Sequence, residues 1–152
     1  MRPGVGAAIL AALPFMTPQT GQAEATQASP RGLDGFVTVD KLNEPTDARL
    51  KQGRVIWGAN CQNCHGGNKA TGAPKITSQK AWQARIDKGM DVLIDHALNG
   101  FVGPRYTEMP PRGANPDLTD EQVGLAVAFM VWSSGGAVEA TEFITKMKET
   151  NQ

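Results

Sequence analysis

The sequence has only two cysteines, no excess of charge of either sign and no apolar run long enough to cross a membrane. Lys plus Arg and Asp plus Glu number 15 each, so the formal net charge is zero and no polyanion such as nucleic acid is expected as a partner. The N-terminal apolar run, residues 5–16, is well short of the roughly 20 residues that span a bilayer. The 152 residues, 40% of them hydrophobic, therefore predict one domain around one small core.

The N-terminus has the pattern of a secretory signal peptide. Arg2 precedes the apolar run, and an Ala-Glu-Ala sequence ending at Ala25 follows it as a cleavage site. We expect residues 1–25 to be removed and the mature protein to be periplasmic, whereas an uncleaved segment would anchor it to the membrane. Residues 26–45 mix proline, glycine and scattered charges without a sustained period, and predict an extended leader that lies over the domain.

Helical periodicity runs through residues 46–136 and predicts an all-α domain. Thr46 is predicted to cap the first helix, and Asp117 or Thr119 to cap the longest one. Gly89 is predicted to end the second helix. A C-terminal tail, residues 137–152, is expected to add a short helix. The predicted helices cover, in order, residues 46–58, 79–88, 91–100, 117–132 and 140–148.

The segment between the third and fourth of these helices, residues 101–116, is rich in proline and glycine. It carries Pro104, Pro110, Pro111, Pro116, Gly103 and Gly113. Proline lacks a backbone donor and fixes φ, so we expect a long loop without regular structure. No strand pair is predicted in the chain.

The two cysteines lie in one pentapeptide, Cys61-Gln62-Asn63-Cys64-His65. This spacing is the attachment signature of c-type haem, because two thiols add to the vinyl groups on one porphyrin edge and the next residue places its imidazole beneath the iron. The alternatives are chance, a dithiol redox pair, which normally sits where a strand meets a helix, and a zinc site, which would want four ligands. The motif predicts one covalent haem c with iron, held by Cys61 and Cys64 and ligated by His65.

The second axial ligand must come from elsewhere in the chain. Met109 is the best candidate because it precedes two prolines in the predicted loop, where its side chain is displayed instead of packed. The alternative is a gap-filling role in the core, which is common for methionine and fits Met130 on its helix. His96 is the competing ligand, but its helical position beside Asp95 favours a partly exposed structural residue.

Six short motifs accompany one another between about residue 50 and residue 132. They are Gly53-x-x-x-Trp57, Cys61-Gln62-Asn63-Cys64-His65, Gly72-Ala73-Pro74-Lys75, Trp82-x-x-Arg85, Met109-Pro110-Pro111-Arg112-Gly113 and Leu118-Thr119-Asp120. With them the sequence resembles the class I c-type cytochromes, most closely the bacterial cytochrome c5 type. The resemblance implies the class I cytochrome c fold, in which four to five helices wrap around one covalently bound haem. It also implies that two helices cross where Gly53 lets Phe129 or its neighbours approach closely.

The resemblance assigns roles to three more residues. The carbonyl of Pro74 should accept a hydrogen bond from His65 and fix its tautomer. Trp82 and Arg85 would lie near the haem propionates. For Trp82 core packing is an equal alternative, and Arg85 could instead be solvated.

An iron held by His65 and Met109 has no open coordination position, so the predicted function is single-electron transfer between redox partners, without catalysis. The expected partners are a protein donor and acceptor, with a periplasmic dehydrogenase or terminal oxidase as candidates. Two alternatives are a dedicated cytochrome subunit of such a complex, and a haem enzyme or gas binder in which Met109 is labile.

Charge is distributed unevenly along the chain. In residues 66–90 five cations face one anion, whereas in residues 91–121 six anions face two cations. We expect the first segment, which is basic, to orient the protein at acidic partner surfaces, because such steering speeds weak encounters. The alternative is that scattered lysines only keep the surface soluble.

Overall fold

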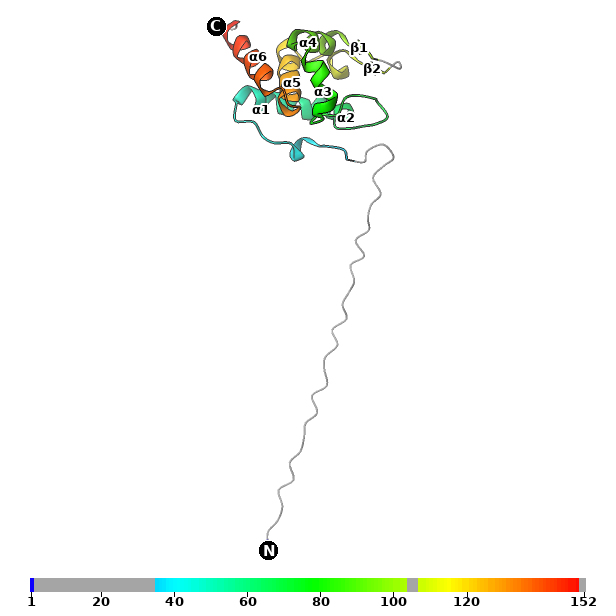
Figure 1. Ribbon diagram of the computed structural model, residues 1–152, viewed down its shortest axis with the longest axis vertical. Coiled ribbons are helices and arrows are strands. Elements are labelled where there is room, and N and C mark those ends of the chain that lie inside the picture. Colours follow the sequence, from blue (N-terminus) through cyan, green and yellow to red (C-terminus); the bar gives the residue numbers. More distant parts are fainter. Residues whose placement is uncertain (2–34, 104–106, 151–152) are drawn as a thin grey trace.

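The computed structural model describes residue 1, residues 35–103 and residues 107–150 (Figure 1). Helices dominate these residues, which confirms the all-α prediction. The described part holds six α-helices, more than the four to five expected. In chain order the elements are the 3₁₀-helix η1 (Val39–Lys41), α1 (Ala48–Asn60), α2 (Gln62–His65), α3 (Gln79–Ile86), α4 (Met90–Asn99), β1 (Phe101–Val102), β2 (Glu108–Met109), the 3₁₀-helix η3 (Pro111–Ala114), α5 (Asp120–Ser133) and α6 (Ala137–Thr150).

Helix α1 begins one residue later than the sequence suggests. Its N-cap is Asp47, whose carboxylate accepts the backbone N–H groups of Arg49 and Leu50 over 2.8 and 3.1 Å. The prediction that Thr46 caps this helix is therefore wrong, because a carboxylate one position along reaches the free N–H groups of the first turn. The helix continues past Gly58 to Asn60 and delivers the chain into Cys61.

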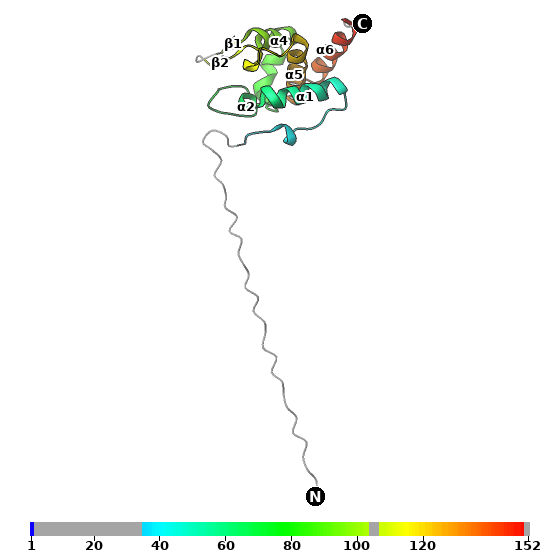
Figure 2. The ribbon, with the colours of Figure 1, turned by 180° about the vertical axis from the view of Figure 1, so that it is seen from behind.

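Helices α1 and α5 cross at the centre of the molecule (Figure 2). A Cβ on Gly53 would collide with the main-chain carbonyl of Leu125 and would lie 3.2 Å from the Cβ of Phe129. The rings of Trp57 and Phe129 then meet at 6.1 Å between centroids, and both side chains are fully buried. The predicted close crossing at Gly53 is confirmed, and the missing side chain is what allows it.

Helix α5 is the central element of the core. Of the two predicted caps it uses Thr119, which forms a reciprocal capping box with Gln122. The nine successive residues 123–131 are all buried, so neighbours cover the helix on every side. The prediction that α5 is the longest helix is wrong among the described residues, because α6 has the same 14 residues.

Helices α3 and α4 are short and share one turn. Helix α3 ends at Ile86, two residues before the predicted end, and the N–H of Gly89 then bonds to the Ile86 carbonyl over 2.9 Å. Gly89 has φ 91° and also directly precedes Met90, the first residue of α4. The C-cap of α3 is Asp87, so the prediction that Gly89 ends this helix is wrong by two residues, and Gly89 is instead the N-cap of α4.

The segment 101–116 contains regular structure that was not predicted. Strands β1 and β2 pair antiparallel, with Phe101 opposite Met109 and Val102 opposite Glu108, and η3 follows directly. The expectation of a loop without a strand pair is wrong. Strand β1 ends before the first proline of this segment and β2 lies between Pro104 and Pro110, so no proline has to donate a hydrogen bond within the pair.

The segments outside the predicted domain both lie against it. Residues 35–44 form a strap along α1 and α2, with Leu42 buried. At the other end α6 is longer than predicted and packs on α5 through Ala140 and Ile144, which are 0% and 3% exposed. The predicted signal peptide and residues 26–34 lie outside the described residues, apart from Met1. Over the described ranges, no helix has the length and apolarity needed to cross a membrane.

Candidate functional site

The cysteine motif continues the direction of α1 into a single extra turn, α2. Cys61 ends α1 with its N–H on the carbonyl of Trp57 over 2.8 Å, and its own carbonyl accepts the N–H of His65 over 3.0 Å. Cys61 and Cys64 are both partly exposed, and neither forms a disulfide. The turn therefore presents two thiols and one imidazole from five consecutive residues.

His65 is held in one tautomer by the chain. Its side chain is 6% exposed, and its Nδ1 lies 2.9 Å from the carbonyl oxygen of Pro74, the contact expected from the resemblance. A carbonyl oxygen can only accept, so Nδ1 carries the proton and Nε2 is left as the lone-pair donor. Burial lowers the pKa of His65, the Pro74 bond opposes this, and the positive charge of Arg85 adds to it. The imidazole is thus kept neutral, the form that binds a metal.

The environment of Cys61 favours a neutral sulfur. Burial, with a smaller contribution from Cys64, raises the pKa of the Cys61 thiol to about 11. The thiolate, which is the form that takes part in zinc binding and disulfide exchange, is thus disfavoured at this position. No group of three or more His, Cys, Asp or Glu residues able to hold a metal ion occurs within the described ranges. A thioether, which carries no charge, fits the same position without penalty.

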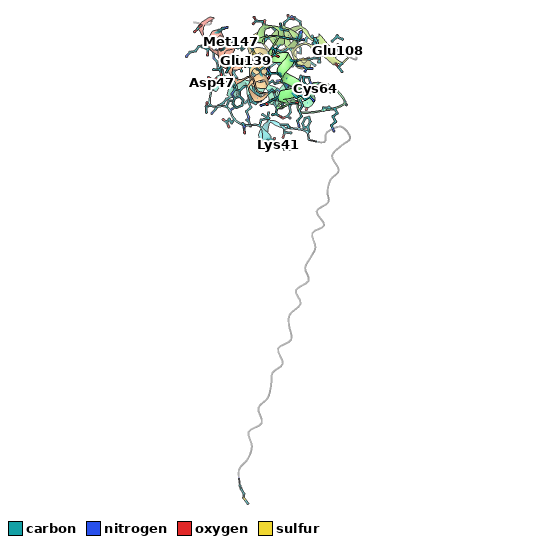
Figure 3. The ribbon with its side chains drawn as sticks, viewed as in Figure 1. Lys41, Asp47, Cys64, Glu108, Glu139 and Met147 are labelled. Carbon is teal, nitrogen blue, oxygen red and sulfur yellow. The ribbon has the colours of Figure 1, made fainter. Side chains whose placement is uncertain are left out.

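A partly open pocket, called the cavity below, lies beside the motif and is lined by Cys61, His65 and Met109. In Figure 3, Cys64 of α2 and Glu108, the neighbour of Met109, lie on the same side of the view, and Asp47 and Met147 lie on the other side. The remaining lining is apolar apart from one arginine, and half of its residues come from α5: Ala97, Arg112, Gly113, Leu118, Val123, Ala126, Val127 and Met130. An apolar cavity with one imidazole, one thioether and an adjacent thiol fits a covalently bound haem.

Met109 reaches this cavity from β2. It is partly buried and packs against the core, while its strand neighbour Glu108 is exposed. The display of Met109 was predicted from an irregular loop, but the alternation of a short strand achieves it instead. Met130 lines the same cavity from α5, where it is 5% exposed.

His96 does not line this cavity. Its ring stacks on that of Phe101, with 4.2 Å between centroids and an interplanar angle of 28°. The side chain is partly exposed on α4. The competing ligand His96 is therefore packed against Phe101 of β1, outside the cavity.

Trp82 and Arg85 lie on the His65 side and line no part of the cavity. The Trp82 indole is buried, lies 6.3 Å from the His65 ring between centroids, and donates its N–H to the Lys75 carbonyl over 2.9 Å. Arg85 donates to the main-chain carbonyl of Ala81. For Trp82 this geometry favours the core-packing alternative, and contact of either residue with the propionates stays a prediction.

Comparison with known proteins agrees with this geometry. Residues 48–130, more than half of the chain, match the family model described as "Cytochrome C oxidase, cbb3-type, subunit III". Cytochrome c-555 of Chlorobaculum thiosulfatiphilum is 43% identical over 82 residues, which are 54% of this chain and 93% of that protein. The chain belongs to the class I c-type cytochromes. It is therefore a small monohaem protein that carries covalently bound haem c with iron and transfers electrons.

Two further relatives place this cytochrome more closely. Cytochrome c-555 of Prosthecochloris aestuarii is 41% identical over 85 residues, 54% of this chain and 85% of the relative. Cytochrome c5 of Ectopseudomonas mendocina is 34% identical over 77 residues, 49% and 82% of the two chains. The resemblance to the c5 type is thus confirmed. The strap and α6 lie outside the span that matches the family model.

Sequence reasoning missed two residues around the cytochrome's cavity. Arg112 lines it and bonds to the start of α5, although the motif that contains it was recognised. Asn115 donates to Asn60 over 2.7 Å and ties the Met109 segment to the end of α1. The contact of Asn115 joins residues far apart in the chain, and that of Arg112 is made through its side chain. No local sequence pattern predicts either contact.

Proposed function

We propose that this chain is a periplasmic electron carrier whose haem is bound by Cys61 and Cys64 and ligated by His65 and Met109. The observation that carries the proposal is that His65 and Met109 line one apolar cavity together with Cys61. When bound, the haem supplies one iron that alternates between the ferric and ferrous states. The protein acts as a carrier without catalysis, because two protein ligands leave no position for a substrate.

The chain's own residues support this assignment by fixing both ligands. The Pro74 carbonyl orients the neutral imidazole of His65, and the β1–β2 pairing holds Met109 opposite Phe101. The apolar residues of α5 line the space between them. Preorganised ligands keep their positions when the charge of the site changes, which favours rapid electron transfer.

The ligand assignment is tested by the charge-transfer band from sulfur to ferric iron in the near-infrared spectrum. We expect the band in the purified protein and its loss in Met109→Ala. The matched control is Met130→Leu, which removes the other methionine sulfur that lines the cavity while nearly preserving volume, and which should retain the band. A band that survives in Met109→Ala and disappears in Met130→Leu would assign the ligand to α5 instead.

The partner surface of this carrier is proposed to be basic and centred on α3. Lys80 on α3 and Lys88 just after its end are exposed. Lys75, in contrast, is bonded to the Gly35 carbonyl of the strap over 2.6 Å. We expect Lys80→Gln with Lys88→Gln to slow electron transfer to an acidic redox partner at low salt and to weaken its ionic-strength dependence. An electron-transfer rate of the unmodified protein that does not change with ionic strength would contradict this docking mode.

The periplasmic location is proposed from the N-terminal sequence alone. Fractionation of cells that express the full chain, with haem staining of each fraction, tests it. Recovery of a haem-stained chain that begins after Ala25 in the periplasmic fraction is the expected result. Haem staining confined to the membrane fraction at full length would mean that the segment is an anchor.

A further inference from the structure

Arg112 ties the Met109 segment to the beginning of α5. Its Nη1 donates to the main-chain carbonyl of Leu118 over 2.7 Å, and its Nη2 donates to Oδ1 of Asp120 over 2.6 Å. Leu118 and Asp120 flank Thr119, the N-cap of the helix that lines the cavity. One side chain thus connects the segment that carries the candidate ligand to the opposite wall of its cavity.

We propose that Arg112 is a positioning residue that holds Met109 in the cavity and thereby sets how readily its sulfur can be displaced from the iron. The inference rests on the proposed ligation by Met109 and adds to it a residue to which no role was assigned. Arg112 stands three residues after Met109, so a bond from its side chain restrains the intervening Pro110 and Pro111 as well. Both prolines have fixed φ and transmit the restraint with little slack.

The backbone around Arg112 needs such a restraint. Arg112, Gly113 and Ala114 have φ of 53°, 64° and 65°, so three successive residues are left-handed and two of them are not glycine. Conformations of this kind persist only where the surroundings hold them. The two hydrogen bonds of the guanidinium restrain the first of these residues, which directly follows the prolines.

A second tether fixes the far end of the same segment. Asn115 donates to Asn60, the residue before Cys61, over 2.7 Å. This bond holds the segment against α1 whether or not Arg112 is present. Loss of the guanidinium should therefore loosen the Met109 side without detaching the whole segment, which separates ligand displacement from global unfolding.

The two bonds of Arg112 are expected to contribute unequally. The side chain of Asp120 is 74% exposed and that of Arg112 is 28% exposed, and ion pairs of such exposure contribute little. The Leu118 carbonyl accepts from a charged donor, which makes the stronger kind of bond. This acceptor belongs to the main chain, so no substitution of the Leu118 side chain removes it. The role is thus carried mainly by Arg112 and the backbone of residue 118.

The test measures how tightly free imidazole binds to the ferric protein, because imidazole must displace the sulfur and its apparent affinity rises with the fraction of displaced protein. Arg112→Asn is the main variant, since asparagine tolerates left-handed φ better than most residues. Arg112→Lys keeps the charge but replaces the rigid planar fork, whose two nitrogens reach the two acceptors, by a single flexible ammonium group. Arg49→Gln is the matched control, because Arg49 also donates to a main-chain carbonyl. This 2.8 Å bond to Ile144 lies outside the cavity.

We expect imidazole to bind about tenfold more tightly to Arg112→Asn than to the unmodified protein, the size of one charge-assisted hydrogen bond. Arg112→Lys should lie in between, and Arg49→Gln should match the unmodified protein even where urea shows that it is less stable. Equal imidazole affinity in Arg112→Asn and the unmodified protein would overturn the proposal while leaving Met109 as ligand. If Met109→Ala leaves both the charge-transfer band and the imidazole affinity unchanged, the ligand assignment itself is wrong and the role of Arg112 falls with it.

Discussion

Val39 donates its backbone N–H to the side-chain oxygen of Gln62 over 2.6 Å, and Gln62 stands inside the cysteine motif. The carbonyl of Val39 accepts from Arg54 over 2.6 Å, so one strap residue is fixed to both α1 and α2. Two positions earlier, Val37 donates to the Gly66 carbonyl, which directly follows His65. The strap therefore fastens the motif from outside the cavity.

Replacing Gln62 with alanine should weaken this fastening. We expect the free energy of unfolding to fall by about 1 kcal/mol, because a partly buried N–H loses its acceptor, while the absorption spectrum stays unchanged. Urea unfolding followed by helical circular dichroism measures the loss. Gln83→Ala is the control, since Gln83 bonds only to Asp87 in an exposed position, and an equal loss there would show that the strap contributes nothing.

Replacing Gly53 with alanine should be far more damaging. A Cβ there meets the Leu125 carbonyl, which is backbone and cannot rotate away, so we expect a loss of about 3 kcal/mol in unfolding free energy. Gly124→Ala is the matched control within α5. Its Cβ would meet only the tip of the Phe143 ring at 3.2 Å, which can move, and the gain in helix propensity offsets the strain. Similar losses in the two variants would contradict the close crossing.

The sequence was most informative where chemistry or sterics act locally. The spacing from Cys61 to His65 predicts that the two thiols and the imidazole lie close together, because the five residues are adjacent and form the single turn α2. The resemblance implied the helix crossing at Gly53, and close backbone contact compensates for the roughly 1 kcal/mol that a glycine within a helix costs relative to alanine. Thr119 carried its capping box within four residues.

The remainder depends on contacts that no local pattern encodes. The pairing of Phe101 with Met109 joins two-residue strands separated by several residues, and such short strands show no alternation to recognise. Asp47 replaced Thr46 as a cap because both residues can cap and only the backbone geometry decides. The full length of α6 depends on the groove that α5 offers to Ile144.

Acid should protonate His65 only below the ordinary pKa of a histidine side chain. Burial lowers the pKa of His65 from its usual 6.5, so the unfolded chain binds that proton more readily than the folded protein does. The associated stability is fully present above about pH 6.5 and is lost as the pH falls through the lowered pKa. A pH titration of the low-spin spectrum measures the transition. His96→Gln should leave the curve unchanged, because His96 lies outside the cavity, and a transition at or above pH 6.5 would refute the buried neutral imidazole.

Helix α6 should stabilise the fold without affecting the iron. Ile144 is 3% exposed and packs into the core, so Ile144→Ala should lower the unfolding free energy by about 3 kcal/mol through lost burial and the cavity left behind. Val138 on the same helix is 66% exposed, and Val138→Ala should change it by less than about 0.5 kcal/mol.

The near-infrared band separates this stabilising role from a role at the site. No residue of α6 lines the cavity beside His65, so both α6 variants should retain the band under conditions where they are folded. Loss of the band in folded Ile144→Ala would mean that α6 acts on the Met109 ligation through α5. An effect of Val138→Ala as large as that of Ile144→Ala would instead mean that the exposed face of α6 is covered by another molecule in solution.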